Sequence, residues 1–271
     1  MIPKIIHYCW FGGHPLPELA KKCMASWKAF FPNYEIKEWN ETNYDVHKIL
    51  YTSEAYGAKK YAFVSDYARF DILYQHGGIY FDIDVEVVRP FDDILINGGF
   101  MGLESKRAGR LGLSIGCNAG LGMGCNAELN IIHQILEYYK NLHFLNKDGS
   151  FNLKTVVEYV TMVLKMNGLR EEDKIQILDG LVIYPTEYFC PMSFESGKLN
   201  ITENTYSIHH YDASWTSMYQ KEYDQIKKNI YNRLGYKIGQ IVIWPHFLLW
   251  QVKEHGFKKT LMKIIAKIKT N

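Results

Sequence analysis

The sequence predicts an α/β fold with a mostly parallel central sheet, followed by a C-terminal helical tail. Strand-like apolar runs alternate with amphipathic helical runs over the first 90 residues, and this order builds a parallel sheet covered by helices. Hydrophobic residues make up 47% and charged residues 22% of 271 positions, which is ordinary for a chain with a real core. We place one large domain at residues 1–235 and a helical, basic tail at residues 236–271.

The N-terminal region supplies the first strand–helix–strand unit. Residues 3–11 and 34–39 have strand character, and residues 18–31 between them form an amphipathic helix that stops at Pro32. The first strand ends in Trp-Phe-Gly-Gly, at the sheet edge where α/β folds bind nucleotides. We interpret His7 within this strand as a structural histidine.

Residues 62–90 change their period in the middle. The first half predicts a helix that ends at Gly77-Gly78, with Asp66 and Arg69 on one face because they lie three residues apart. We expect the Arg69 guanidinium to point into a cleft. From residue 79 onward, apolar and polar residues alternate, which predicts one strand up to residue 88 with an oily and an acidic face.

The acidic face carries Asp82, Asp84 and Glu86 side by side. Neighbouring carboxylates repel one another, and no cationic residue lies close to them in sequence. A divalent cation would resolve the repulsion, since hard ions prefer carboxylate oxygens. The alternative is a solvated edge strand, because an isolated Asp-x-Asp is a weak motif.

The remaining elements continue the alternation. Residues 116–124 contain four glycines beside Asn118, which permits close backbone approach to a ligand, although no phosphate-loop lysine follows. Further strands are expected at residues 98–102 and 174–184, and helices at residues 44–61, 126–141 and 153–167.

Composition excludes several classes of function. A net charge of +2 gives no electrostatic field of the kind that binds nucleic acid. The five cysteines are odd in number and contain no C-x-x-C pair, which favours free thiols in a reducing compartment. No signal peptide is recognisable at the N-terminus, so we expect a cytoplasmic protein.

The central stretch resembles a known signature. Ser65-Asp66-x-x-Arg69, Leu73, Gly77-Gly78-Ile79-Tyr80 and Asp82-Ile83-Asp84 together look like the sugar-nucleotide-binding region of DXD glycosyltransferases. More narrowly, they resemble the family that groups yeast-type α-mannosyltransferases with bacterial capsule and lipopolysaccharide glycosyltransferases (glycosyltransferase family 32-like). Clostridial glucosylating toxins share a related core. The resemblance implies a GT-A type, Rossmann-like fold, a nucleotide-sugar donor, bound Mn²⁺ or Mg²⁺, and retention of the α configuration.

The resemblance also assigns residues that contact the donor. In the family, the N-terminal strand lies beside the nucleotide base, so Tyr8, Trp10 and Phe11 become candidates for stacking. A small-residue strand with an asparagine lines the donor sugar, which points to Asn118. Ser65, Asp66 and Arg69 would hold the ribose or the sugar hydroxyls.

A second site of resemblance lies at residues 206–215, a run that is similar to the family's late His/Ser-Trp motif. It implies a histidine metal ligand opposite the DXD acids, with Ser214 and Trp215 at the nucleotide sugar. Carboxylate and imidazole ligands suit Mn²⁺. Strand alternation lets only one of His209 and His210 face the site. We favour His209, with His210 second and Asp212 as a further possible ligand.

These assignments define the expected site and function. Asp84 and His209 would hold the metal with Asp82 nearby, and the catalytic group consists of Asp82, Asp84, Arg69 and Asp66. We expect a hexose or N-acetylhexosamine, most simply from a UDP-sugar, to be transferred to a growing surface polysaccharide. Two alternatives stay open: a haloacid-dehalogenase-like phosphatase with Asp82 as nucleophile, and a non-catalytic protein that binds sugar nucleotides.

The C-terminal segment, residues 256–271, has a composition of its own. Five lysines surround an apolar stripe at helical spacing, and no acidic residue is present. We expect this segment to contact an anionic membrane, which would make the enzyme peripheral on the inner face of the cell membrane. The acceptor would then be a polyprenyl-diphosphate-linked glycan.

Overall fold

The computed structural model describes residues 1–107, 113–193, 196–212, 218–257 and 260–261. The chain forms two compact units, one of residues 1–192 and 200–211, the other of residues 193–199 and 212–271. The predicted boundary after residue 235 falls inside helix α8 (Met218–Val242), so the compact units divide the chain earlier than expected.

The first unit is built on a seven-stranded sheet with the order β2-β1-β3-β6-β5-β8-β7. Five of these strands run in one direction, whereas β6 and β7 run antiparallel to their neighbours. The predicted α/β class with a mostly parallel central sheet is therefore confirmed. The strands are β1 (Ile5–Cys9), β2 (Glu35–Trp39), β3 (Gly78–Tyr80), β5 (Gly99–Arg107), β6 (Leu113–Cys125), β7 (Gln176–Leu178) and β8 (Leu181–Tyr184).

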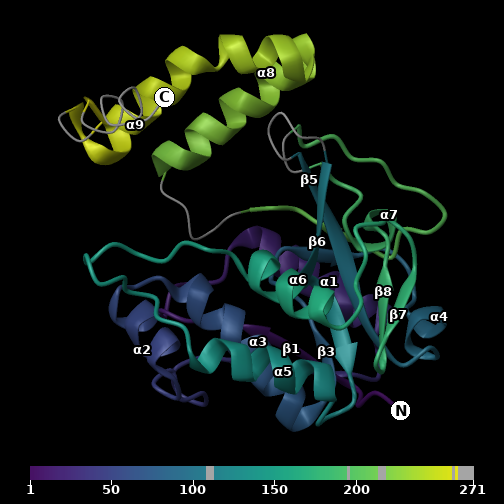
Figure 1. Ribbon diagram of the computed structural model, residues 1–271. Coiled ribbons are helices and arrows are strands. Elements are labelled where there is room, and N and C mark those ends of the chain that lie inside the picture. Colours follow the sequence, from purple (N-terminus) through teal and green to yellow (C-terminus); the bar gives the residue numbers. More distant parts are fainter. Residues whose placement is uncertain (108–112, 194–195, 213–217, 258–259, 262–271) are drawn as a thin grey trace. The chain divides into compact units, whose positions relative to one another are not determined.

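An apolar core lies on each face of this sheet, and the helices divide between the two faces (Figure 1). Along β3, Ile79 and the following Phe81 enter one core while Tyr80 enters the other, as strand alternation requires. One face is covered by α2 (Leu50–Gly57), α3 (Tyr61–His76), α5 (Asn130–Lys140) and α6 (Val156–Met166); the other by α1 (Glu18–Phe30), α4 (Asp92–Leu95) and α7 (Thr186–Phe189).

The structure corrects the prediction of one strand over residues 79–88. Strand β3 ends at Tyr80, and β4 (Val85–Val87) belongs to a separate two-stranded sheet with β9 (Ser207–His209). The backbone between them turns, with the Val85 amide donating to the Asp82 carbonyl at 3.1 Å. Periodicity could not show this break, because the alternation of residue types continues across the turn.

Two other predicted elements differ in detail. Residues 174–184 form the hairpin β7–β8 instead of one strand, since Gly180 adopts a positive φ of 70° between them. The helix pair expected at residues 44–61 contains one helix, α2, and residue 61 already begins α3.

His7 is a structural histidine, as interpreted from the sequence. It is fully buried, its Nε2 lies 2.9 Å from the Gly77 carbonyl, and its Nδ1 accepts a hydrogen bond from the Trp39 indole at 3.1 Å. The Nε2 therefore carries the proton and donates to Gly77. Burial lowers the pKa of His7 to about 4, which keeps the ring neutral.

The second unit is helical. Gly235 interrupts α8 with non-helical φ and ψ of 70° and 170°, and α9 (Trp244–His255) follows. Tyr223 of α8 stacks on Trp250 of α9 at 5.1 Å between ring centroids, and Phe247 closes the cluster. Among the described helices, none combines the length and the apolar character needed to cross a membrane. Of the predicted membrane segment, only residues 256, 257, 260 and 261 are described.

Candidate active site

Helix α3 places Arg69 inside the protein. The helix ends where Gly77 adopts φ 62° and its amide caps the Leu73 carbonyl. Only 4% of the Arg69 side chain is exposed, its Nε donates to the Ser65 carbonyl at 2.9 Å, and its Nη2 lies 3.2 Å from Asp66 Oδ1. The expectation that this guanidinium projects into a cleft is therefore corrected: Arg69 is a buried cation that holds carboxylates.

Asp82 is fixed by three contacts from the first unit. Its two carboxylate oxygens lie 3.3 and 3.4 Å from the Arg69 guanidinium, and the Tyr80 hydroxyl donates to Oδ1 at 3.0 Å. The Arg69 guanidinium in turn lies 5.0 Å from the Tyr80 ring centroid. Asp82 nevertheless remains 28% exposed, so its carboxylate is oriented and still accessible.

Asp66 shares Arg69 with Asp82 but lies deeper. Burial raises the pKa of Asp66 to about 7; the positive charge of Arg69 opposes this effect and the negative charge of Asp82 adds to it. The site thus contains two carboxylates in different environments around one guanidinium. Asp66 is buried and contacts Arg69 from inside the protein, whereas Asp82 is partly exposed to solvent.

Strand β6 passes close to Asp82 at Gly120. The Asp82 amide donates to the Gly120 carbonyl at 3.1 Å, and a Cβ atom at position 120 would lie 1.9 Å from Asp82 Oδ2. A side chain at position 120 would therefore displace the Asp82 carboxylate. The Gly120 amide donates to Asn118 Oδ1 at 2.8 Å, and Asn118 Nδ2 donates to the buried Glu104 at 2.6 Å.

Asn118 is among the residues predicted from the sequence, whereas Gly120, Glu104 and Tyr80, which the structure places around Asp82 and Asn118, are not. The glycine-rich run had signalled a close backbone approach, although its partner could not be read from the chain. Glu104 carried no signal, because a single glutamate in a strand is usually solvated.

The β4–β9 pairing brings the late histidine to the acidic turn. His209 lies opposite Val85 in the ladder, and its Nε2 is 3.2 Å from Asp84 Oδ1. His210 points elsewhere, with its Nε2 2.8 Å from Glu86 Oε2. The two histidines thus separate as strand alternation predicts, and His209 is the one that joins the acids.

Each of the three carboxylates has a cationic or imidazole neighbour in the folded protein. Asp82 contacts Arg69, Asp84 contacts His209, and Glu86 lies 2.9 Å from Lys22 of α1. The expectation of an uncompensated acidic face is therefore wrong. The partners come from residues 13 to 125 positions away, so no local pattern could reveal them.

Asp82, Asp84 and His209 form a group that fits a divalent metal. One ligand atom from each lies within 4.8 Å of the others. His209 is 90% buried as a side chain, and its Nδ1 has no hydrogen-bond partner within the described part of the chain. Burial alone lowers the pKa of His209, but the charge and hydrogen bond of Asp84 raise it above its ordinary value. Two carboxylates and an imidazole are a donor set that Mn²⁺ accepts.

The N-terminal aromatic residues differ in accessibility. Tyr8 and Phe11 are 6% and 3% exposed, and the Tyr8 hydroxyl donates to Glu38 at 2.6 Å. Rings packed in the core present no open face for stacking on a nucleotide base, which speaks against these two candidates. Trp10 is partly exposed and donates through its indole to the His14 carbonyl at 2.6 Å, so it remains a candidate.

The remaining predicted site residues are Ser65, Asp212, Ser214 and Trp215. Ser65 is half-buried, and its carbonyl accepts the bond from Arg69. Asp212 belongs to the second unit, where Lys221 lies 3.7 Å from it. Ser214 and Trp215 fall outside the described residues.

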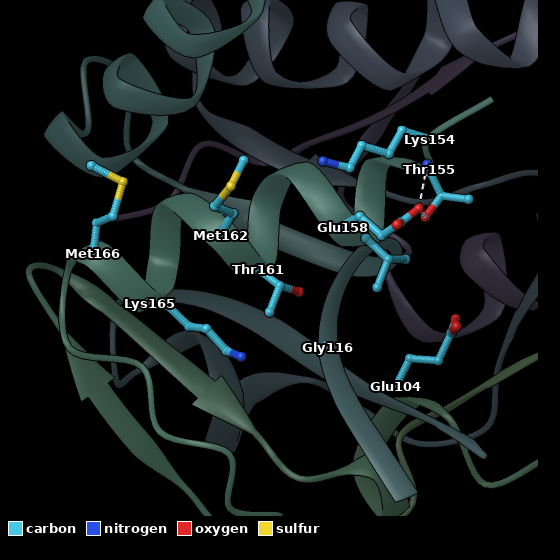
Figure 2. Close-up of a pocket in the computed structure, with 10 residues that line it drawn as sticks. Glu104, Gly116, Lys154, Thr155, Glu158, Thr161, Met162, Lys165 and Met166 are labelled. Atoms are coloured by element: carbon cyan, nitrogen blue, oxygen red, sulfur yellow. Dashed lines mark hydrogen bonds between the residues drawn. The ribbon is translucent and has the colours of Figure 1, made fainter. Parts of the chain in front are cut away.

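A pocket of about 720 Å³ opens between α6 and the start of the Gly116–Gly120 segment of β6 (Figure 2). Glu104 and Gly116 line it from the sheet, while Thr161, Met162 and Lys165 line it from the helix. Glu104 connects this pocket to the metal-binding candidates through Asn118 and Gly120.

Part of the chain is similar to known glycosyltransferases. Residues 17–101 match the family profile described as the glycosyltransferase sugar-binding region containing the DXD motif. Inositol phosphoceramide mannosyltransferase 3 of Schizosaccharomyces pombe is 33% identical over 102 residues, which are 35% of this chain and 27% of that protein. An uncharacterized glycosyltransferase of Acanthamoeba polyphaga mimivirus is 33% identical over 110 residues, covering 37% of this chain and 42% of its own.

Two solved structures are similar at low sequence identity. The PaToxG glycosyltransferase aligns over 61% of this chain and 69% of its own, with a TM-score of 0.44 and 17% identity. A glycosyltransferase involved in glycosylation of the major capsid of PBCV-1 aligns over 84% of this chain and 100% of its own, with a TM-score of 0.43 and 13% identity. The resemblance to DXD glycosyltransferases is confirmed by the sequence matches, although this chain spans less than half the length of the curated relatives.

Proposed function

We propose that this protein is a metal-dependent glycosyltransferase that moves a sugar from a nucleotide-sugar donor to a glycan acceptor. The observation that carries the proposal is the convergence of Asp82, Asp84 and His209 beside the Gly120 backbone. Asp82 and Asp84 lie inside the region that matches the DXD family. Asp82 follows β3, whose carboxyl end is the usual nucleotide-binding edge of an α/β sheet.

The residues of the site have distinct tasks in this proposal. Asp84 and His209 would hold Mn²⁺ or Mg²⁺, with Asp82 as a further ligand or a contact to the ribose. The bound metal would offset the negative charge that develops on the departing nucleoside diphosphate. Arg69 and Tyr80 keep the Asp82 carboxylate in one orientation, and Asn118 fixes the Gly120 backbone against it. We assign no nucleophile.

The finer parts of the proposal come from the resemblance. The donor is a UDP-hexose or UDP-N-acetylhexosamine, and the product keeps the α configuration. The acceptor is a growing capsular or lipopolysaccharide glycan on a polyprenyl diphosphate, and the enzyme works at the inner face of the cell membrane. Residues 256–271 supply five lysines for contact with that surface.

The pocket beside α6 is the place we propose for the acceptor. Its size falls in the range of ligand sites, and its wall residue Glu104 is bonded to Asn118, the candidate donor-sugar residue. Filling it by Met162→Trp should raise the KM for acceptor at least about tenfold and leave donor hydrolysis unchanged. The matched control is Ile177→Trp on β7, an exposed position that does not line the pocket.

The phosphatase alternative requires Asp82 to attack phosphorus, yet Arg69 and Tyr80 already engage its carboxylate. A direct test separates the three functions. Purified protein is incubated with UDP- and GDP-sugars with and without Mn²⁺, and release of nucleoside diphosphate is measured beside thermal shift. A transferase should hydrolyse one of the donors slowly, and it should do so only when Mn²⁺ is present. Phosphate release from sugar phosphates would support a phosphatase, and stabilisation without turnover would support a binding protein.

A further inference from the structure

The charges of the chain are divided unequally between its two compact units. The second unit contains twelve Lys and Arg against five Asp and Glu, a net charge of +7. The first unit contains nineteen against twenty-four, a net charge of −5, so that the whole chain shows only +2. The modest total therefore conceals a strongly basic helical unit. From residue 227 onward, Glu254 is the only acidic residue in the sequence.

The same unit exposes large apolar side chains on its helices. Ile238 and Ile241 lie three residues apart near the end of α8 and are 58% and 76% exposed. Trp244 at the start of α9 and Phe257 just after it are 53% and 70% exposed. The charged helical unit therefore leaves large isoleucine, tryptophan and phenylalanine side chains more than half exposed.

Ile238 and Ile241 are not part of the aromatic cluster that holds α8 against α9, whereas Trp244 stacks on Phe247 at its edge, with 5.7 Å between the ring centroids. The interhelical packing comes from Tyr223, Phe247 and Trp250, together with the ion pair between Lys253 and Glu222 at 2.9 Å. The buried Gly239 would place a Cβ 2.5 Å from the Tyr231 ring, which shows how closely the two segments of α8 approach. The helices can therefore keep their packing while another surface covers Ile238 and Ile241.

We infer that the exposed apolar side chains Ile238, Ile241, Trp244 and Phe257 of the second unit, together called its apolar face, insert into the interface of an anionic lipid bilayer. Charge complementarity selects this partner: from residue 227 onward the sequence contains ten Lys and Arg against one acidic residue, and interfacial helices combine basic residues with Trp, Phe and Ile. Two copies of a unit with a net charge of +7 would repel each other, and a nucleic acid would leave the apolar side chains exposed to water. The inference extends membrane contact from residues 256–271 to the helices before them. It does not depend on the transfer activity.

The first test is co-sedimentation of the full chain with vesicles of phosphatidylcholine alone or with about one third phosphatidylglycerol. Wild type should bind the anionic vesicles at least about tenfold better, and 0.5 M salt should weaken binding. Ile238→Glu combined with Ile241→Glu should reduce binding at least tenfold. The matched control is Ile96→Glu with Ile177→Glu, two residues of the first unit that are 85% and 80% exposed.

Other occupants of the face give different results. If wild type does not bind anionic vesicles, or if both double variants lose binding equally, the proposal is overturned. A double variant that turns a dimer into a monomer in sedimentation velocity while vesicle binding persists would show an interface between copies. A large loss of thermal stability without any vesicle binding by wild type would show that the face packs on the first unit. Binding to RNA in place of vesicles would identify a nucleic-acid surface.

A second measurement does not depend on the folding of the glutamate variants. Vesicles with brominated lipid should quench part of the wild-type tryptophan fluorescence, and Trp244→Phe should remove most of that quenching. Quenching that is the same in wild type and in Trp244→Phe would contradict insertion of this face. Thermal stabilisation by a nucleotide sugar, measured in the same samples, reports the proposed catalytic site independently.

Discussion

The two compact units use their apolar and charged residues in opposite ways. The first places large side chains in two cores around a sheet, and two of its acidic residues, Asp82 and Asp84, lie at one turn beside Arg69 and His209. The second packs a small aromatic cluster, leaves Ile241 and Phe257 largely exposed, and has a net charge of +7, whereas the net charge of the first is −5. This difference is the basis of our proposal that the first unit performs the chemistry and the second attaches the protein to a surface.

The proposed separation of roles would be contradicted if variants of the first unit also changed vesicle binding. Arg69→Ala carries the largest expected effect, because it leaves Asp66 and Asp82 buried or half-buried without their shared cation. We expect a loss of about 3–5 kcal/mol of folding stability together with the activity. Urea unfolding measures it. The control Lys22→Ala removes an exposed partner of Glu86 and should leave the melting temperature unchanged. A stable, inactive Arg69→Ala protein would instead mean that the guanidinium acts on the substrate.

Asp84→Ala should greatly reduce sugar transfer while the protein remains folded. Transfer should fall by a factor on the order of 10²–10³, and stabilisation by nucleotide with Mn²⁺ should disappear. Glu86→Ala, two residues along on β4, is the matched control, since Glu86 pairs with His210 and Lys22 outside the metal group. If Asp84→Ala and Glu86→Ala lost transfer activity equally, the carboxylates would act only through their negative charge and not as metal ligands. Vesicle binding should be the same for both variants.

Gly120→Ala tests the close approach of β6 to Asp82. The new Cβ would meet Asp82 Oδ2 at 1.9 Å, so the carboxylate must move, and a displacement of about 1 Å costs roughly 10²-fold in rate. Gly57→Ala is the control, because no atom lies within 4 Å of its added Cβ and its φ is not positive. Steady-state rates at saturating donor distinguish the two. Full activity in Gly120→Ala would contradict the role assigned to Asp82.

The smallest effect concerns the protonation of His7. Its pKa is lowered to about 4 by burial, so the folded protein holds the neutral ring with the proton on Nε2. Nitrogen-detected NMR of the imidazole should show this tautomer unchanged from pH 8 down to about pH 5. Titration near the ordinary value of 6.5 would mean that the bond to Gly77 or to Trp39 opens in solution.

The sequence was informative wherever a signal was local. The helix at residues 61–76 and its stop at Gly77 followed from apolar spacing and a glycine pair, and the alternation of His209 and His210 followed from strand geometry. The dense motif from Ser65 to Asp84 was specific enough to identify the DXD region, which the family profile confirms. Each of these features depends on neighbours within a few residues.

Only the tertiary structure decided what surrounds those residues. The strand expected over residues 79–88 is interrupted at Asp82–Asp84. Arg69 is buried and holds two carboxylates, where we expected it to point into a cleft. Tyr8 and Phe11 are also buried. These outcomes depend on groups far apart in the chain, since the partner of Asp84 lies on β9 and the backbone beside Asp82 comes from β6. Residue patterns fix local conformation and charge. The solvation and the partners of a side chain are set by the distant segments that pack against it. For that reason the sequence could name candidate site residues but could not predict their contacts.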